Sequence, residues 1–285
     1  MEFVRSRNFE GIYGEIAEML LTLGNWVEGS TTWQAQDISN RPEMVPLEVE
    51  NVIFQMPMPR NITSAQVVTY PNLPWAEEHF LERVGGMPLN PPPSARTWPF
   101  AQAGHASHTD EWGMFSHTYP ERFWPKHAGH DISGYCDDRE CEAGPHSGIR
   151  FQLGDLDDVA KLLHDDPLTR QAFLPIWFPE DTGATKGQRV PCSLGYHFMI
   201  RHNKLHVTYL IRAVDFMRHF RDDVYMAIRL GQWMTQCANV EGLTIGHLTM
   251  HTMSMHCFAG DIDSLRQVVA GKARRETQRL LGAMR

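Results

Sequence analysis

The chain has 285 residues, of which 42% are hydrophobic and 21% are charged. This length and composition suit one large domain or two small ones with an ample core. No run of about 18 apolar residues occurs, so we predict no membrane span. The net charge of −8 disfavours binding to nucleic-acid polymers, because proteins that bind them without sequence specificity are usually basic.

The N-terminal segment M-E-F-V-R-S-R-N-F-E does not contain the apolar h-region of a signal peptide. The five cysteines are an odd number, which indicates free thiols in a reducing compartment more than a disulfide framework. We therefore expect a cytoplasmic protein.

The first part of the chain predicts a helix, a strand and a second helix. Phe9 to Trp26 carries apolar residues at helical spacing, and the helix should end at Gly24. Pro46 to Met56 has the composition of a strand. Trp75 to Val84 predicts a helix that stops at Gly85 and Gly86.

Residues 88–143 show no clear period and predict an irregular, insertion-like segment. Cys136 and Cys141, together with His130 and His146, have ligand types for zinc. Their spacing is not a standard C-x2-C pair, and nothing completes four ligands, so we expect no metal site.

Regular structure resumes at Asp155, which should cap a helix that ends before Pro167. Ala172 to Phe178 predicts a strand. Gly195 to Arg201 and Leu205 to Arg212 predict a hairpin.

Beyond the hairpin, Asp222 or Asp223 should begin a helix, Leu243 to Met250 should form a strand, and Asp261 to Leu281 should form a helix. No repeat or linker divides the chain, so we expect residues 1–285 to form one domain. Strands and helices in this order predict a mixed α/β fold in which helices cover a large sheet.

Short polar motifs accompany these predicted elements. In chain order they are D-P-L-T-R-Q from Asp166, W-F-P-E-D from Trp177, P-C at Pro191, R-A-V-D from Arg212, F-R-D-D from Phe220 and H-T-M-S-M-H from His251. The order resembles the thymidylate synthase family, whose motifs run D-P-x-S-R-R, W-x-P-x-D, P-C, R-S-x-D, a polar base-reading residue and H-x-Y-x-x-H. The resemblance covers residues 144–258 and implies the thymidylate synthase-like fold, with a large mixed β-sheet.

The resemblance implies that Cys192 is a nucleophile. In the family the matching cysteine adds to C6 of a pyrimidine nucleotide, which makes C5 reactive toward the methylene group of 5,10-methylenetetrahydrofolate. A free thiol has a pKa near 8.5, and a nearby cation such as Arg212 would lower it. A lone cysteine is more often a buried core residue, but the flanking motifs favour the catalytic interpretation.

Arg212 and Arg170 match family arginines that bind the nucleotide phosphate, for which a guanidinium fork is well suited. In the family, the arginine that Arg170 matches comes from the partner subunit, so the resemblance implies a homodimer with shared sites. Gln171 and Ala213 replace a second arginine and a serine of the family motifs. Arg41 or Arg60 would be alternative phosphate ligands.

Asp223 stands where thymidylate synthases have an asparagine that reads uracil. A carboxylate instead accepts a hydrogen bond from the N4 amine of cytosine, and an aspartate at this position resembles the deoxycytidylate (dCMP) 5-hydroxymethyltransferase branch. The plainer alternative is a helix N-cap, a role that Asp222 would fill equally well. Asp215 and Trp177 match positions that the family uses for the folate.

Several other residues are implied to contact the nucleotide. His251 matches a histidine that holds the sugar hydroxyl, while His197 and Ser193 replace a glutamine and a histidine near the base. Glu77, or alternatively Glu78, would organise proton transfer at the base. Met253 replaces the sugar-binding tyrosine, so a ribonucleotide stays open as a substrate.

Taken together, the motifs imply a folate-dependent C5-hydroxymethyltransferase that acts on a cytidine monophosphate, foremost dCMP. Cys192 would form an adduct at C6, and water would add in the last step to give the 5-hydroxymethyl product. The alternatives are methylation or hydroxymethylation of dUMP, and a homologue that binds a nucleotide without turning it over.

Overall fold

The computed structural model describes most of the chain, in the ranges 2–6, 8–33, 36–99, 109, 113–126, 154–182 and 189–283. The four candidate zinc ligands between His130 and His146 lie outside these residues, as does much of the irregular segment 88–143.

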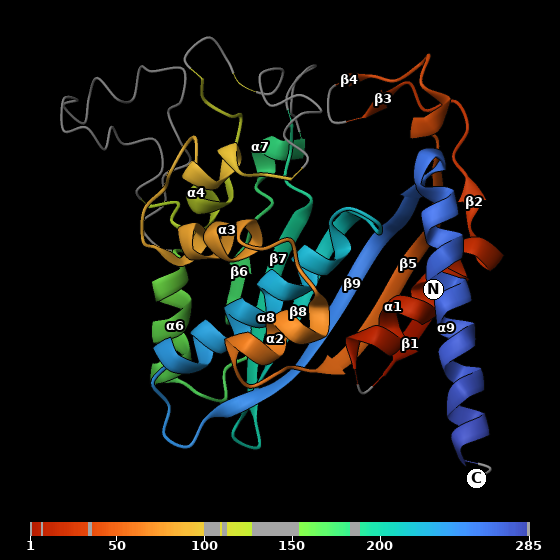
Figure 1. Cartoon of the computed structure of the whole chain (residues 1–285). Coiled ribbons are helices and arrows are strands. Elements are labelled where there is room, and N and C mark those ends of the chain that lie inside the picture. The colour runs from red at the N-terminus through yellow and green to blue at the C-terminus, as the bar shows by residue number, and fades with distance from the viewer. Residues whose placement is uncertain are drawn as a thin grey trace.

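A seven-stranded sheet forms the centre of the described structure (Figure 1). Its main path runs β1-β5-β9-β8-β7-β6, and β2 pairs with β5. The β1–β5 and β8–β9 pairs are parallel and the others antiparallel, so the predicted mixed sheet is confirmed. The strands are β1 (Glu2–Arg5), β2 (Asn25–Trp26), β5 (Pro46–Pro57), β6 (Phe173–Pro175), β7 (Ser193–Arg201), β8 (Lys204–Asp215) and β9 (Thr244–Phe258).

Helices α1, α2, α6 and α8 lie in front of this sheet, and α9 runs beside α1 (Figure 1). The small hairpin of β3 (Thr32–Trp33) and β4 (Gln36–Asp37) lies apart from the main sheet. The described α-helices are α1 (Phe9–Leu23), α2 (Ile62–Thr69), α3 (Trp75–Val84), α4 (Tyr119–Phe123), α6 (Leu156–Asp165), α7 (Pro179–Thr182), α8 (Phe220–Cys237) and α9 (Ile262–Ala283).

Local signals explain where several elements begin and end. The Asn8 side chain accepts a hydrogen bond from the Gly11 amide and caps α1, which ends before Gly24 as predicted. Asp155 caps α6, as predicted. His202 and Asn203 have positive φ angles of 52° and 55°, the conformation of the tight turns that join antiparallel strands, and they link β7 to β8.

Two predicted boundaries are wrong. Helix α8 begins at Phe220, so Asp222 and Asp223 lie in its first turn and neither caps it. Strand β9 continues past Met250 to Phe258, because β5 and β8 pair with it on both sides over this length. The extension places both His251 and His256 on β9.

Helix α8 packs on the sheet through the predicted stripe, whose members are all buried: Val224, Ala227, Ile228, Gly231, Met234 and Ala238. Its first turn thereby lies close to the ends of β8 and β9. Among the described residues, we find no helix with the length and apolar character needed to cross a membrane.

Candidate active site

A cavity of about 500 Å³ lies between α3, the first turn of α8 and the last residues of β8. This volume is in the range of small-molecule sites. Its wall includes four of the residues predicted from sequence: Cys192, Arg212, Asp215 and Asp223. These residues come from separate elements, so the fold brings the motifs together.

Cys192 directly precedes β7, and Arg212 of β8 holds it in place. The Arg212 amide donates a hydrogen bond of 2.8 Å to the Cys192 carbonyl. The guanidinium donates to the Pro191 carbonyl at 2.8 Å and the Val190 carbonyl at 3.2 Å, and Nη2 lies 3.9 Å from the Cys192 Sγ. Arg212 therefore fixes the turn that presents the thiol.

Burial raises the pKa of the Cys192 thiol, and Arg212 and Arg189 lower it only in part. The expected lowering of the thiol pKa by Arg212 is therefore present, but the effect of burial outweighs it. A thiol in this state is largely protonated at neutral pH, so its activation requires additional positive charge or a base.

Asp222 and Asp223 are neighbours on α8 with different environments. Asp222 is 1% exposed, and its carboxylate accepts hydrogen bonds of 2.7 Å from both the amide and the side chain of Asn72. Burial raises the pKa of Asp223 to about 7, while Arg83 opposes the shift. Asp222 is thus engaged in the fold, whereas Asp223 is available for a ligand in the cavity.

Helix α3 presents Trp75, His79 and Arg83 to the cavity. Their spacing of four residues places them on one face of the helix. This spacing was visible in the sequence, but the face that α3 turns toward the cavity is set by packing against α8. The sequence alone therefore did not identify these residues as site residues.

Glu77 lies on another face of α3 and is not part of the cavity wall. Its carboxylate forms a two-point ion pair with Arg229, at 2.8 and 3.0 Å, and accepts a 2.6 Å hydrogen bond from Tyr225. Glu78, the alternative, is exposed and accepts a hydrogen bond from Thr97. The expectation that Glu77 serves the base is corrected accordingly: it joins α3 to α8.

His79 has a defined environment on the cavity side of α3. Its Nδ1 lies 3.0 Å from the Ser94 hydroxyl and 3.5 Å from the Glu82 carboxylate, and its ring stacks on Trp75. Burial, with Arg83, lowers the pKa of His79 to about 4. The imidazole is therefore neutral at pH 7.

Arg189 is a further cation in the cavity wall that the motifs did not indicate. It lies before Cys192 in the chain, and burial lowers its pKa although the guanidinium stays charged. The expected alternatives Arg41 and Arg60 are exposed and lie outside the cavity wall, and Arg41 pairs with Glu43.

Asp215 ends β8 and lies at the cavity wall. Its Oδ1 accepts hydrogen bonds of 3.1 Å from the amides of Met217 and Arg218. Its Oδ2 is buried without a hydrogen-bond partner among the described residues, although Arg218 approaches it to 3.7 Å. Burial raises the pKa of Asp215 to about 6. The residue combines a cap at the end of β8 with an acceptor that a ligand N–H could use.

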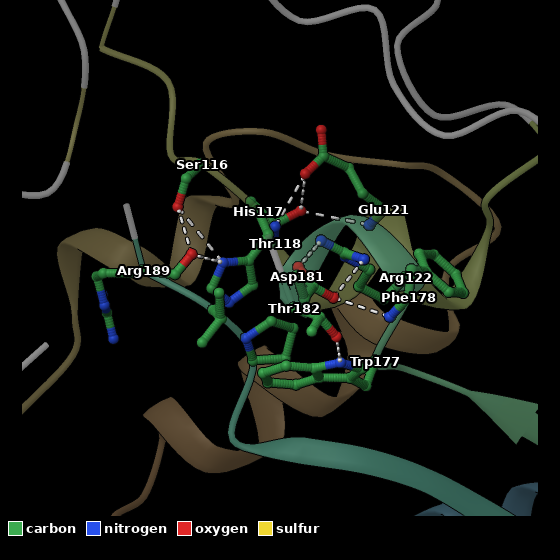
Figure 2. A network of polar contacts seen from close by, with 12 residues as sticks. Ser116, His117, Thr118, Glu121, Arg122, Trp177, Phe178, Asp181, Thr182 and Arg189 are labelled. Carbon is green, nitrogen blue, oxygen red and sulfur yellow. Dashed lines mark hydrogen bonds and ion pairs between the residues drawn. The ribbon is translucent and has the colours of Figure 1, made fainter. Parts of the chain in front are cut away.

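A polar network lies beside the cavity, and its Arg122–Asp181 pair is buried (Figure 2). Arg122 of α4 pairs with Asp181 of α7 through hydrogen bonds of 3.1 and 2.9 Å. Ser116 donates to the Arg189 carbonyl at 3.0 Å, and His117 Nδ1 lies 3.1 Å from the same oxygen. Breaking the buried ion pair between α4 and α7 would cost about 3–5 kcal/mol. The segment before Cys192 is attached separately, through the contacts of Ser116 and His117 to the Arg189 carbonyl.

The placement of the two histidines on β9 corrects one prediction. His251 lies outside the cavity wall, 3.3 Å from the Asn51 side chain. His256 lines the cavity instead, and the two are roughly 16 Å apart along an extended strand. His256, Cys257 and Phe258 also match the first part of the H-x-Y-x-x-H motif, a histidine followed two positions later by an aromatic residue. Aligning the motif with His256 would have selected the histidine that lines the cavity.

The remaining predicted residues lie around the cavity but not in its wall. Ser193 is buried and bonded to the hydroxyl groups of Tyr119 and Tyr209. Trp177 hydrogen-bonds Thr182 through its indole N–H (Figure 2). Arg170 is exposed, and its carbonyl oxygen lies 3.0 Å from the His197 ring nitrogen.

Comparison with solved structures identifies the architecture. The thermostable thymidylate synthase A of Bacillus subtilis superposes with a TM-score of 0.64, covering 92% of this chain and 84% of that chain at 16% identity. The chain therefore has the thymidylate synthase fold, as predicted.

Curated proteins that resemble the chain in sequence carry the same name. A “putative thymidylate synthase” of Methanosarcina barkeri is 29% identical over 120 residues, which is 42% of this chain and 53% of that protein. One from Methanothermobacter marburgensis is 23% identical over 180 residues, which is 60% of this chain and 77% of that protein. No protein-family model matches the chain.

In its first-ranking alignments the chain spans about half the length of the curated relatives it matches. The relatives and the shared fold nevertheless agree: the chain resembles putative thymidylate synthases in sequence and has the thymidylate synthase fold. The dCMP hydroxymethyltransferase branch is not distinguished by these comparisons.

Proposed function

We propose that the chain transfers a one-carbon unit from 5,10-methylenetetrahydrofolate to C5 of a pyrimidine nucleoside monophosphate. The observation that carries this proposal is the meeting of Cys192 and Asp223 in one cavity, with Arg212 in contact with the thiol. Within this class the favoured substrate is dCMP and the favoured product is its 5-hydroxymethyl derivative.

Cys192 acts by forming a bond from its sulfur to C6 of the base. A dianionic phosphate would lie near Arg189 and Arg212, which are both cations of the cavity wall. Arg189 lies shortly before Cys192 in the chain, and Arg212 contacts its thiol. Asp223 accepts from the N4 amine, and His256 takes the sugar-binding role that His251 was expected to have. C5 takes up the methylene carbon and loses its proton, and tetrahydrofolate leaves. Water then adds to the exocyclic methylene carbon, and the Cys192 sulfur leaves C6 to give the free 5-hydroxymethyl product.

The residues present fit a folate. The buried Asp215 Oδ2 without a hydrogen-bond partner suits a ring N–H, and the aromatic side chains of Trp33 and Trp98 in the cavity wall suit a planar ring. When bound, the folate supplies a methylene group as an electrophile. Trp177 lies outside this wall, so Asp215 is the better candidate of the two predicted folate ligands.

The test is release of tritium from nucleotides labelled at C5, measured for dCMP, CMP, dUMP and UMP with methylenetetrahydrofolate. We expect dCMP to give the fastest release, with 5-hydroxymethyl-dCMP as the product in mass spectrometry. Thymidylate formation from dUMP would support the alternative activity. Binding of a nucleotide without tritium release from any of them would show a non-catalytic homologue.

We also propose a homodimer with sites shared between subunits. Side chains that alternate with the buried ones along the central strands are half-buried on the face of the sheet away from α8, among them His197, Met199, Thr208 and Leu210. Phe173 and Met253 are each 39% exposed. A partly apolar sheet face of this kind is typical of an interface, and Arg170 at its edge is free to reach a partner.

If the sites are shared, Arg170→Ala and Cys192→Ala subunits should each be inactive alone and regain part of the activity when mixed. The mixed dimer then contains one site with both residues intact. Activity assays after subunit exchange measure this recovery, with unmixed variants as controls. An active monomer in sedimentation would contradict the proposal.

A further inference from the structure

Arg83 is a buried cation whose hydrogen bonds the described structure does not satisfy. Its side chain lines the cavity although the residue is only 4% exposed. Nε has no hydrogen-bond partner, and no ion pair with a carboxylate is formed within the described part of the chain. A guanidinium buried in this way is costly unless a ligand supplies acceptors.

The position of Arg83 leaves its N–H groups available. Its Cζ lies 3.9 Å from the centre of the Tyr119 ring, so the ring covers one face of the guanidinium. The N–H groups lie in the guanidinium plane and not along this contact. The Arg83 carbonyl accepts a 2.9 Å hydrogen bond from the Trp124 indole, which helps to fix the end of α3.

Arg83 lies near Asp223, the proposed base-reading residue. Both line the cavity. The positive charge of Arg83 lowers the pKa of Asp223 and so favours the ionised carboxylate. The pair thus offers the N–H donors of the Arg83 guanidinium beside the Asp223 carboxylate, which is an acceptor. A phosphate is a poor occupant here, because Asp222 and Asp223 are both close to this end of the cavity.

We propose that Arg83 is a second specificity-determining residue, which donates to N3 and O2 of cytosine while Asp223 accepts from the N4 amine. This rests on the proposed function. Cytosine presents two adjacent acceptors next to an amine donor, which matches a fork next to a carboxylate. Uracil presents an N3–H donor between two acceptors, so its N3–H would face the donors of Arg83.

The test is the dissociation constant for dCMP and for dUMP, measured by calorimetry without folate at pH 8, above the Asp223 pKa of about 7. In Arg83→Met, affinity for dCMP should fall roughly 10- to 150-fold, the range for a hydrogen bond to a charged group. Affinity for dUMP should stay equal or increase. Arg83→Lys keeps the charge without the fork and should lose part of the dCMP affinity.

Arg221 supplies a matched control, because its Cζ lies 4.4 Å from the Tyr13 ring but it is not in the cavity wall. Arg221→Met should leave both affinities unchanged. A deoxynucleotide of pyrimidin-2-one, which has N3 and O2 but no amine, separates the two residues. Its binding should weaken in Arg83→Met and not in Asp223→Asn.

Equal loss of dCMP and dUMP affinity in Arg83→Met would overturn the inference and indicate a phosphate ligand. Unchanged affinities would also overturn it. If Arg83→Met does not fold, Arg83→Lys decides the question, and an unchanged ratio of the two affinities in that variant refutes base reading. Failure of the proposed function would be seen separately. In that case the wild-type protein would still bind dCMP more tightly than dUMP but would release no tritium.

Discussion

Replacing Cys192 by alanine should reduce turnover by roughly 10⁴-fold or more, because no other group in the mechanism forms the bond to C6. Binding of the nucleotide should change little, since the phosphate, sugar and base contacts come from other side chains. Single-turnover tritium release and calorimetric binding measure the two effects on the same protein.

Cys237 provides the control for this variant, as a thiol on α8 that is exposed and outside the cavity wall. Cys237→Ala should retain wild-type turnover. Mass spectrometry of the wild type trapped with a 5-fluorinated nucleotide should place the adduct on the peptide that contains Cys192. Wild-type turnover in Cys192→Ala would show that catalysis does not proceed through this sulfur.

Replacing Asp223 by asparagine should weaken dCMP turnover and improve dUMP turnover. Leaving a buried polar group unpaired costs about 1–3 kcal/mol, so each change should be roughly 5- to 150-fold. Both changes lower the ratio of the kcat/KM value for dCMP to that for dUMP, so this ratio shifts by their product. Steady-state kinetics with both nucleotides on both proteins gives this ratio.

The neighbouring residue is an internal control for charge. Asp222→Asn removes the same charge from the same helical turn, but its carboxylate binds Asn72. We expect this variant to have a free energy of unfolding that is lower by about 1–3 kcal/mol. The ratio of its kcat/KM values for dCMP and dUMP should equal that of the wild type. A wild type that prefers dUMP would mean that Asp223 does not select cytosine.

The sequence predicted those parts of the fold that depend on local signals. Helix α1 ends before Gly24 and Asp155 caps α6, both as predicted, and the hairpin turn at His202 depends on two residues that tolerate positive φ. The start of α8 was wrong because Asp222 resembles an N-cap, yet its carboxylate binds Asn72 instead of the helix amides. Only tertiary contacts decide between these roles.

The candidate site was predictable where ordered motifs pointed to one residue, as at Cys192 and Asp223. It was not predictable on α3, where the choice between Glu77 and the His79 and Arg83 face depends on how the helix is rotated against α8. Arg189 was missed because it belongs to no motif, and its carbonyl contacts come from a distant segment at Ser116.

The division of labour between Asp222 and Asp223 has an evolutionary consequence. The attachment of α8 to the segment at Asn72 depends on one of these residues, and the choice of pyrimidine is proposed to depend on the other. A single codon change at position 223 can then alter the nucleotide pool on which a lineage draws without loosening this attachment. Selection for a stable protein and selection for a new substrate act on adjacent positions with little conflict.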